Sequence, residues 1–413
     1  MGCRYSRSRH SAAAVRTLAD LEAWLDQAVN RERSGAFGEI RLAGFRAFLR
    51  FLPPAPAPCT VGGTKGKGST VRLIEAALLG AGEHTVAFTS PHVHRVTERW
   101  RLDGRPVTVA ELAPLVPVVA VAEQRSGIPL SYFERTAALA VLLAADRPGC
   151  HLLWEVGLGG RLDCANAFDC RVAVLTHLSH DHRDILGPTL RHIAAEKLPI
   201  ARAGRPLLIA PQSSAAREAI AGQLPSGAAV RWVAAPVPPE APFTLALAGQ
   251  HQQDNAATAW AAFKLLAPQA DETAARAGMA QATLAARCQL VQQGGRRVLV
   301  DGAHNGPSIA ATVAVAAATL CPGWRLVLGV ASDKEIVEIQ AVLPPGVALS
   351  RCGYASVRAR GPADWPAELL VAPWFADIVA ALAAVPEGDL CITGSFYLAG
   401  EALAALGAEE LPG

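Results

Sequence analysis

Apolar residues along this chain form short continuous runs that alternate with longer stretches of helical periodicity. The short runs predict buried strands at Thr85–Ser90, His151–Val156, Arg171–Leu178 and Leu207–Ala210. The periodic stretches predict helices at Thr17–Ala28, Ile40–Leu52, Val71–Leu79, Tyr132–Ala145 and Gly249–Leu266. Because strands that alternate with helices form parallel sheets covered on both faces, the pattern predicts an α/β fold.

A second, shorter alternation follows a transition at residues 267–290, with strands expected at Val298–Val300, Leu326–Val330 and Leu390–Thr393. The Pro-, Ala- and Gly-rich stretch at 224–242 is expected to loop over the surface. We therefore predict a disordered tail at 1–16, a P-loop parallel-sheet domain at 17–284 and a smaller Rossmann-like α/β domain at 285–413.

Composition narrows the class of protein. The 413 residues are 51% hydrophobic and 18% charged, which is typical of globular chains. A net charge of +2, with no basic stripe interleaved with aromatic residues, argues against a nucleic-acid binder. Nine cysteines without a CxxC pair favour reduced thiols in the cytoplasm, and no apolar run is long enough to span a bilayer. Residues 1–6 fit a myristoylation pattern and 1–16 resemble a transit peptide, but a disordered extension is the favoured interpretation.

The stretch from Cys59 to Thr70 predicts a phosphate-binding loop. A short β-branched run enters a glycine-rich turn and leaves into a helix, so backbone N–H groups and the helix N-terminus converge on one anion. Lys67 would reach the outer phosphates and Ser69 would ligate Mg²⁺. The spacing differs from the usual P-loop because Gly68 separates Lys67 from Ser69, and a turn with a solvated lysine is the alternative.

Other polar residues follow neighbouring strands of the predicted sheet. Ser90, Glu155 and His182 each come at a strand end, where functional groups of parallel sheets gather. Hard oxygen ligands such as Ser69 and Glu155 suit Mg²⁺ beside a nucleotide. The alternative is that Glu155 is a carboxylate at the end of a strand and binds no metal.

The histidines at 177, 180 and 182, with Asp181, raise the alternative of a zinc hydrolase. No cysteine stands at ligand spacing and no HExxH helix is present, so a metal-bridging His182 with Asp181 behind it is favoured. His177 is expected to have no chemical role.

Lys197, Asp301 and His304 are weaker candidates when each is taken alone. Lys197 could be a solvated surface lysine on a helix. Asp301 and His304 follow a predicted strand and could reach a nucleotide across a cleft, but Asp301-Gly302 is also a common turn dipeptide.

The combination of these segments in their order along the chain is more specific than any one of them. The motifs are Gly63–Ser69, Thr89–His92, Glu155–Asp163, Asp181-His182, Glu196-Lys197, Asp301–Asn305 and Thr393–Ser395. Together they resemble the folylpolyglutamate synthase and dihydrofolate synthase family of the Mur-ligase superfamily, from about Leu18 to Leu403. Gly68, unusual for a P-loop, is normal in that family.

The resemblance implies an ATP-dependent amide ligase that uses Mg²⁺, with up to two ions. In such enzymes a pteroate or folate carboxylate attacks the γ-phosphate of ATP, and the amine of L-glutamate then displaces phosphate from the acyl phosphate. The resemblance assigns catalysis to Lys67, His182, Lys197 and His304. It assigns metal binding to Ser69, Ser90, Glu155, His182 and a carbamylated Lys197. It assigns ATP binding to Gly63, Thr64, Lys65, Gly66, Lys67, Gly68, Ser69, Thr70, Asn255, Arg287, Asp301 and His304.

Several positions depart from the family pattern. Lys65 replaces an asparagine, Leu284–Arg287 keeps only the arginine of Trp-Pro-Gly-Arg, and Leu198-Pro199 replaces Ala-Gly after Lys197. Asp163–Asn166 and His180 also differ. These changes leave the acceptor open, so a Mur-ligase-like amino-acid ligase for another carboxylate and a non-catalytic nucleotide-binding subunit stay as alternatives. The family suggests a monomer without nucleic-acid or membrane partners.

Overall fold

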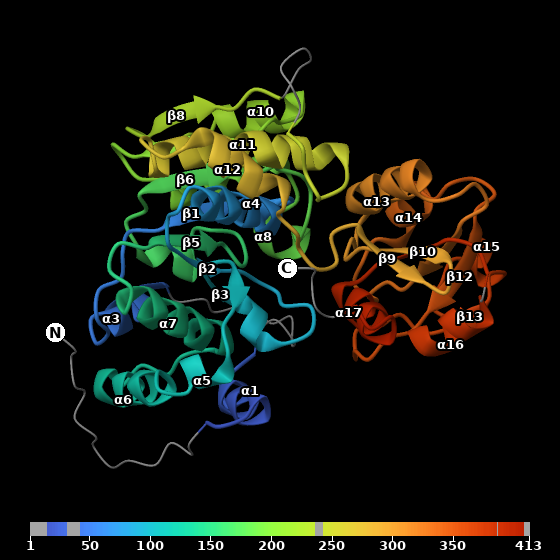
Figure 1. The fold of residues 1–413 in the computed structure, drawn as a ribbon, viewed down its shortest axis with the longest axis horizontal. Helices are drawn as coiled ribbons and strands as arrows, with labels where there is room; N and C mark the ends of the chain where they lie inside the picture. Colours follow the sequence, from blue (N-terminus) through green and yellow to red (C-terminus); the bar gives the residue numbers. More distant parts are fainter. Residues whose placement is uncertain (1–14, 31–41, 236–242, 386, 409–413) are drawn as a thin grey trace.

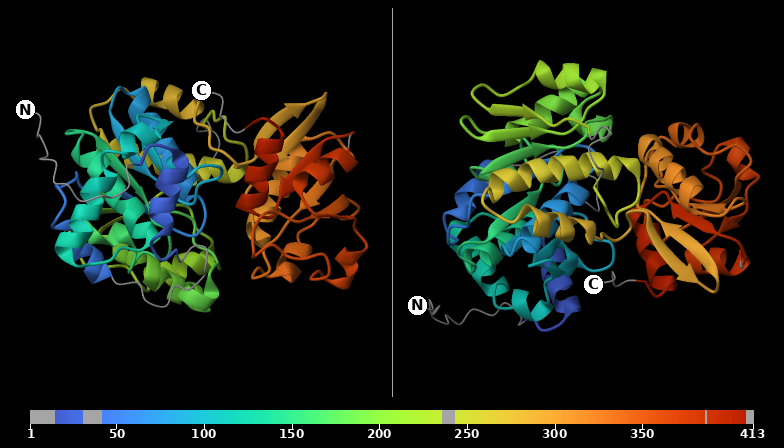
Figure 2. Two further views of the ribbon diagram at one scale, coloured as in Figure 1. Left: turned by 90° about the horizontal axis from the view of Figure 1, so that it is seen from below. Right: turned by 45° about the horizontal axis from the view of Figure 1, so that its top comes forward.

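The computed structural model describes residues 15–30, 42–235, 243–385 and 387–408, which are arranged around two β-sheets (Figure 1). The N-terminal sheet and its helices form one part, and the C-terminal sheet and its helices lie to one side of it (Figure 2). Most of the expected tail at 1–16, with its lipidation pattern, lies outside the described residues.

The first sheet has eight strands in the order β4-β3-β2-β5-β1-β6-β7-β8. Strands β3 and β4 pair antiparallel at one edge, and the other pairings are parallel. The strands are β1 (Cys59–Gly62), β2 (Thr85–Phe88), β3 (Trp100–Leu102), β4 (Arg105–Pro106), β5 (His151–Glu155), β6 (Val172–Leu175), β7 (Pro206–Ile209) and β8 (Ala229–Trp232). The phosphate-loop strand β1 is therefore central and is flanked by β5 and β6.

Helices cover both faces of this sheet, as continuous apolar strands require. On β5, Leu152 and Trp154 face one apolar cluster and Leu153 faces the other. The first cluster includes residues of α1 (Leu18–Asp26), α3 (Leu42–Leu49), α5 (Val109–Leu112), α6 (Val116–Ser126), α7 (Tyr132–Ala145), α8 (Arg183–Leu186), α9 (Leu190–Lys197) and α10 (Ser214–Ala221). The second cluster includes residues of α4 (Lys67–Gly80), α11 (Gln250–Leu266) and α12 (Glu272–Ala280).

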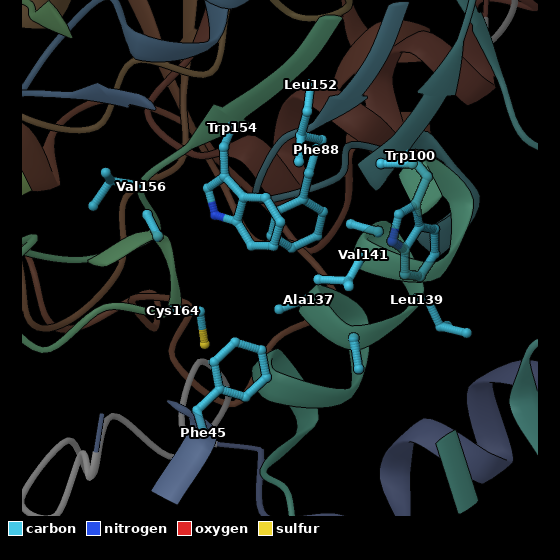
Figure 3. Packing of buried hydrophobic residues seen from close by; sticks show 14 of the residues in the cluster. Phe45, Phe88, Trp100, Ala137, Leu139, Val141, Leu152, Trp154, Val156 and Cys164 are labelled. Carbon is cyan, nitrogen blue, oxygen red and sulfur yellow. The ribbon is translucent and has the colours of Figure 1, made fainter. Parts of the chain in front are cut away.

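Aromatic side chains, among them Phe45, Phe88, Trp100 and Trp154, contribute to the first cluster (Figure 3). The ring of Trp154 lies 4.8 Å from that of Phe88 and 5.0 Å from that of Phe168 between centroids. Trp154 and Phe88 are fully buried, and burying side chains of this size contributes roughly 1.5–3 kcal/mol each. Because Trp154 immediately precedes Glu155, this packing fixes where the Glu155 carboxylate leaves the sheet.

The second sheet has six strands in the order β13-β12-β11-β14-β10-β9, all parallel except the β9–β10 hairpin. Its strands are β9 (Gln289–Gln293), β10 (Arg296–Val300), β11 (Arg325–Leu328), β12 (Ala348–Cys352), β13 (Trp374–Phe375) and β14 (Leu390–Thr393). Its helices are α13 (Gly306–Thr319), α14 (Ile336–Gln340), α15 (Ala367–Leu370), α16 (Ile378–Ala384) and α17 (Phe396–Ala405). The predicted α/β class, with two largely parallel sheets, is confirmed.

One expectation about local structure was wrong. The stretch expected to loop at 224–242 contains β8, the edge strand of the first sheet, whose alternating exposure hid it from a search for buried runs. The transition at 267–290 contains α12 and β9. Helix α12 is capped by Asp271, whose carboxylate accepts hydrogen bonds from Thr273 N and Ala274 N.

Helices α4 and α12 approach closely because glycines meet at their contact. A Cβ atom built on Gly278 would overlap the carbonyl oxygen of Ala76, and one on Gly80 would overlap that of Ala274. Since both obstacles are backbone, neither helix can make room without moving. The phosphate-loop helix is thus held against the sheet by a contact that tolerates only glycine.

We predict that Gly278→Ala lowers the free energy of unfolding by about 1–3 kcal/mol, because the added methyl group forces α12 away from α4. Chemical denaturation measures the change. Gly222→Ala is the matched control, since Gly222 has φ −75° and its nearest neighbours would lie 3.7 and 3.9 Å from the new Cβ. Equal stability of the two variants would show that the helix contact is looser than the structure has it.

Candidate active site

One cavity of about 1450 Å³ lies at the carboxyl ends of the first sheet's strands and is closed on its other side by loops of the second sheet. It brings together almost all of the residues that the sequence singled out. Those lining it are Gly63, Thr64, Lys65, Gly66, Lys67, Gly68, Ser69, Ser90, Glu155, His182, Lys197, Asn255, Arg287, Asp301 and His304. Thr70 does not line it, because its side chain is fully buried in the first turn of α4.

The phosphate loop is anchored to the segment that follows β6. The backbone N–H groups of Thr64 and Lys65 donate to the carbonyl oxygen of His177, at 3.0 and 3.1 Å. The hydroxyl of Thr64 donates to Ser179 O at 3.0 Å. Gly66 has φ 86° and precedes α4, and no described side chain caps that helix. The first N–H groups of α4 are therefore left for a ligand, as in other anion-binding helix termini.

Three lysines surround this loop in different ways. Lys67 Nζ donates to the carbonyl oxygen of Thr64, at 3.3 Å. Lys65 Nζ forms an ion pair with Asp181 Oδ2, at 2.9 Å. Lys197 is only 5% exposed and its Nζ donates to Gly63 O, at 2.9 Å. Burial, aided by the charge of Lys67, lowers the pKa of Lys197 to about 7.

Pro199, which departs from the family pattern, does not displace Lys197. Helix α9 ends at Lys197, and Pro199 lies in the 3₁₀ turn Leu198–Ile200 that follows, where its fixed φ is tolerated. The proline therefore leaves Lys197 pointing to the loop, and the alternative of a solvated surface lysine is wrong.

Glu155 is the last residue of β5, and Ser69 lies in the first turn of α4, the helix that follows the neighbouring strand β1. Ser90 N donates to Glu155 Oε2 at 3.0 Å, and a Cβ on Gly68 would lie 3.6 and 3.7 Å from the two carboxylate oxygens. Burial raises the pKa of Glu155, and the charge of Lys67 opposes that effect. A buried carboxylate beside a serine hydroxyl and a phosphate loop has the oxygen ligands that Mg²⁺ takes in nucleotide sites.

His182 lies at the start of α8 with a left-handed backbone, φ 49°. Desolvation in the cavity wall lowers the pKa of its imidazole to about 4, opposed by Asp181 and reinforced by Lys334. It is therefore neutral near pH 7, the form that ligates metals. Among the described residues, no group of three His, Cys, Asp or Glu side chains is placed to hold a metal ion on its own. This argues against the zinc-hydrolase alternative, whereas Mg²⁺ in nucleotide sites relies largely on phosphate and water ligands.

The second sheet contributes Asp301 and His304 from the loop after β10. The Asp301 carboxylate accepts hydrogen bonds from Cys288 N at 2.7 Å, Ala303 N at 2.8 Å and Thr312 Oγ1 at 2.9 Å. These contacts fix the conformation of the loop that contains Asp301. The interpretation of Asp301-Gly302 as a turn therefore explains most of the hydrogen bonds that the Asp301 carboxylate accepts. His304 hydrogen-bonds Gly302 O through Nδ1 at 3.0 Å, and burial lowers its pKa to about 3.

Asn255 lies on α11 and Arg287 lies just before β9, and both line the cavity. A Cβ on Gly66 would overlap the side-chain oxygen of Asn255, so that glycine lets α11 approach the loop. The Arg287 guanidinium lies 4.5 Å from the ring centroid of Phe396. That stacking holds the arginine at the cavity wall, where its charge, like that of Lys67, opposes the effect of burial on the pKa of Glu155.

Sequence reasoning missed the residues at the far end of the cavity. Arg99 is buried there, with its Nε donating to His92 Nδ1 at 3.0 Å and its guanidinium 5.4 Å from the ring centroid of Tyr132. Apolar neighbours line the same end: Phe45, Phe133, Leu158, Leu162 and Cys164. The sequence signal was faint, because these residues come from four separate segments and none repeats a period.

Comparison with known proteins identifies the family. No protein-family model matches the chain. A curated Escherichia coli relative, dihydrofolate synthase/folylpolyglutamate synthase, is 34% identical over 330 residues, which cover 76% of this chain and 77% of that protein. The chain belongs to the dihydrofolate synthase/folylpolyglutamate synthase family.

Solved structures of the family share the two-sheet architecture. Escherichia coli FolC in complex with DHPP and ADP superposes with a TM-score of 0.79 at 28% identity, covering 96% of this chain and 99% of that one. A bifunctional folylpolyglutamate synthase/dihydrofolate synthase with Mn, AMPPNP and L-glutamate bound has a TM-score of 0.81 at 28% identity, covering 95% and 99%. These relatives do not favour an acceptor outside folate chemistry or a non-catalytic subunit.

In this member of the dihydrofolate synthase/folylpolyglutamate synthase family, the described helices include none with the length and apolar character needed to cross a bilayer.

The buried Lys197 predicts a specific pH dependence of stability. Its pKa is about 7 in the folded chain and near 10.5 when unfolded, so between these values the unfolded state binds a proton that the folded state lacks. Stability contributed by this residue is therefore lowest below pH 7 and rises with pH. Relative to Lys197→Met, the wild type should gain about 1.4 kcal/mol per pH unit from pH 7 to 10.

Urea denaturation of both proteins in CO₂-free buffers measures this difference and keeps the amine unmodified. A difference that stays flat from pH 7 to 10 would mean that Lys197 is protonated in the folded protein.

Proposed function

We propose that this chain is an ATP- and Mg²⁺-dependent ligase that adds L-glutamate to the carboxylate of a pteroate or folate. The observation that carries the proposal is the single cavity in which a phosphate loop, a buried carboxylate and a buried lysine meet the second sheet's His304. Proteins similar to this chain have been solved with ADP, AMPPNP, Mn, DHPP and L-glutamate, and this cavity suits ligands of those kinds.

In the proposed reaction, the acceptor carboxylate attacks the γ-phosphate of ATP, forming an acyl phosphate and releasing ADP. The glutamate amine then attacks the acyl carbon, phosphate leaves, and an amide is formed. The first N–H groups of α4, at Lys67–Ser69, would hold the phosphates, and Lys67 would leave its contact with Thr64 O to stabilise the transferring phosphoryl group. Asn255, Arg287, Asp301 and His304 would form the rest of the nucleotide site.

Four residues would hold a divalent ion: Ser69, Ser90, Glu155 and His182. When bound, Mg²⁺ would neutralise charge between the phosphates and the attacking carboxylate. The Glu155 carboxylate fits that requirement, because it is buried and lies against Gly68 beside the loop.

The acceptor is proposed to enter the end of the cavity lined by Phe45, Tyr132, Phe133 and Leu158. Flat apolar walls suit an aromatic heterocycle, and the buried Arg99 supplies a cation on the path toward Glu155. A long acceptor could thus place its ring at this end and its carboxylate near the phosphate loop.

We further propose the division into domains at 17–284 and 285–413, because each range contains one whole sheet with its own apolar clusters. A monomeric, cytoplasmic enzyme is proposed with it. The described cysteines, all free thiols and mostly buried, are compatible with a reducing compartment.

We predict that purified protein releases ADP and forms a glutamyl product when it is given ATP, Mg²⁺, L-glutamate and dihydropteroate or tetrahydrofolate. Lys67→Ala should lower kcat by at least about 100-fold, since electrostatic stabilisation of the transition state is lost. Lys264→Ala is the matched control, because Lys264 lies on α11 and pairs only at the surface with Glu272.

Mass spectrometry of the product and a coupled ADP assay measure the outcome. The folate assignment would be wrong if neither acceptor is turned over while ATP still binds. Turnover of one acceptor alone would say whether the first glutamate or later ones are added.

Lys197 is proposed to be carbamylated and to help hold a second metal ion. A pKa of about 7 leaves much of the amine neutral at physiological pH, as reaction with CO₂ requires. We predict that bicarbonate raises activity, that Lys197→Ala loses it, and that short carboxylates such as acetate restore part of it. Activity that is insensitive to bicarbonate, together with no rescue, would remove this modification from the mechanism.

A further inference from the structure

One side chain, Asp181, contacts both parts of the molecule at the mouth of the cavity. Its Oδ2 accepts from Lys65 Nζ at 2.9 Å and from Asn305 Nδ2 at 3.4 Å. Lys65 belongs to the phosphate loop, and Asn305 caps the first helix of the second sheet's part, α13. Helix α8, next to Asp181, lies on the side of the first part that faces α13 (Figure 1).

The Lys65 side chain is used for this contact and is directed away from a phosphate role. Its ion pair with Asp181 is largely shielded, with side-chain exposures of 24% and 12%. Charge-assisted hydrogen bonds of this kind are about twice as strong as neutral ones. The phosphate loop is therefore held to Asp181 by a charge-assisted hydrogen bond from Lys65.

The two ends of the Asn305 amide have separate partners. Its Oδ1 accepts from Ser308 N at 3.2 Å and from Ser308 Oγ at 2.7 Å, which caps α13. Its Nδ2 is thereby turned outward and donates to Asp181. The amide thus fixes its own loop with one end and reaches the first part of the molecule with the other.

We propose that Lys65, Asp181 and Asn305 form a bridge that positions the second sheet's loop at 301–305 over the phosphate loop, with Lys65 as a positioning residue and not a phosphate ligand. The bridge lies one residue from His182 on one side and one residue from His304 on the other. Closing it sets those two histidines across the cavity from each other. Contacts between domains are otherwise mobile by default, so a charged bridge at this place decides how well the site is assembled.

The first test measures the distance between the two parts and does not depend on catalysis. Cys321 is the exposed thiol among the described cysteines and lies beyond α13, and Glu218→Cys on α10 supplies a partner site. With Cys3 changed to serine, spin labels at 218 and 321 report the separation with ADP and Mg²⁺ bound. We expect one narrow distance distribution, which broadens toward longer distances in Lys65→Met and in Asn305→Ser.

Serine at 305 is chosen because it is as good a helix cap as asparagine but is too short to reach Asp181. Ser308→Ala is the matched control, since it disturbs the same cap and leaves the amide of Asn305 free to reach Asp181. The proposal is overturned if the distribution is unchanged in Lys65→Met and Asn305→Ser, or if Ser308→Ala broadens it as much as Asn305→Ser does.

The second test is kinetic and rests on the proposed function. Lys65→Met and Asn305→Ser should each lower kcat about tenfold, as expected for loss of a hydrogen bond to a charged group, and the double variant should be no worse than either single one. Asn305→Ser should change the dissociation constant of ADP less than twofold, because the loop N–H groups are untouched. Multiplicative losses in the double variant would show that the two residues act separately and would overturn the bridge.

The two proposals can fail independently. A wild type without ligase activity but with variant-dependent distances would reject the folate-ligase assignment and keep the bridge. A fully active wild type whose distances and kcat do not respond to these substitutions would do the reverse.

Discussion

The structure depends on holding two oppositely charged groups out of water on either side of one glycine-rich loop. Glu155 and Lys197 are each 5% exposed, and burial shifts the pKa of both toward the neutral form. Either charge would strongly destabilise an ordinary core, where an unpaired charge is among the most costly groups to bury. Each keeps a hydrogen bond to the backbone around the loop, from Ser90 N to the Glu155 carboxylate and from Lys197 Nζ to Gly63 O.

That arrangement requires the loop to stay in place when the site is empty, and the sheet provides this. Strands β5 and β6 flank β1, so groups that follow all three strands meet over the loop. The carbonyl of His177 receives two N–H groups of the loop, which ties the end of β6 to the end of β1. His177 therefore supports the loop through its backbone carbonyl, and the absence of a chemical role for its side chain stays a prediction.

Much of the fold and the outline of the site could be predicted from sequence, for physical reasons. Strands such as β5 and helices such as α7 are buried on most sides, so apolar periodicity marked them clearly. Edge strand β8 is half-exposed, and its mixed composition resembled a loop. The observed ends of some elements also differ from the predicted ones. Helix α4 begins at Lys67, inside the predicted loop, because glycine at 66 lets the helix start there.

Contacts between segments far apart in the chain could not be predicted. Lys65 in the sequence looked like an added positive charge beside the phosphates, because nothing local to residue 65 reveals Asp181, 116 residues away. Similarly, the Asp301 carboxylate looked free to reach a nucleotide, although Thr312 and two backbone N–H groups already hold it.

The same argument explains how a departure from the family pattern can be tolerated at the most sensitive loop of the enzyme. A lysine in place of asparagine would disturb phosphate binding if its charge faced the nucleotide. Paired with Asp181, it leaves the charge at the phosphates to Lys67 and adds a contact toward the second sheet instead. The lysine at residue 65 therefore affects how the two halves of the site meet. It leaves unchanged the backbone N–H groups that are proposed to bind phosphate.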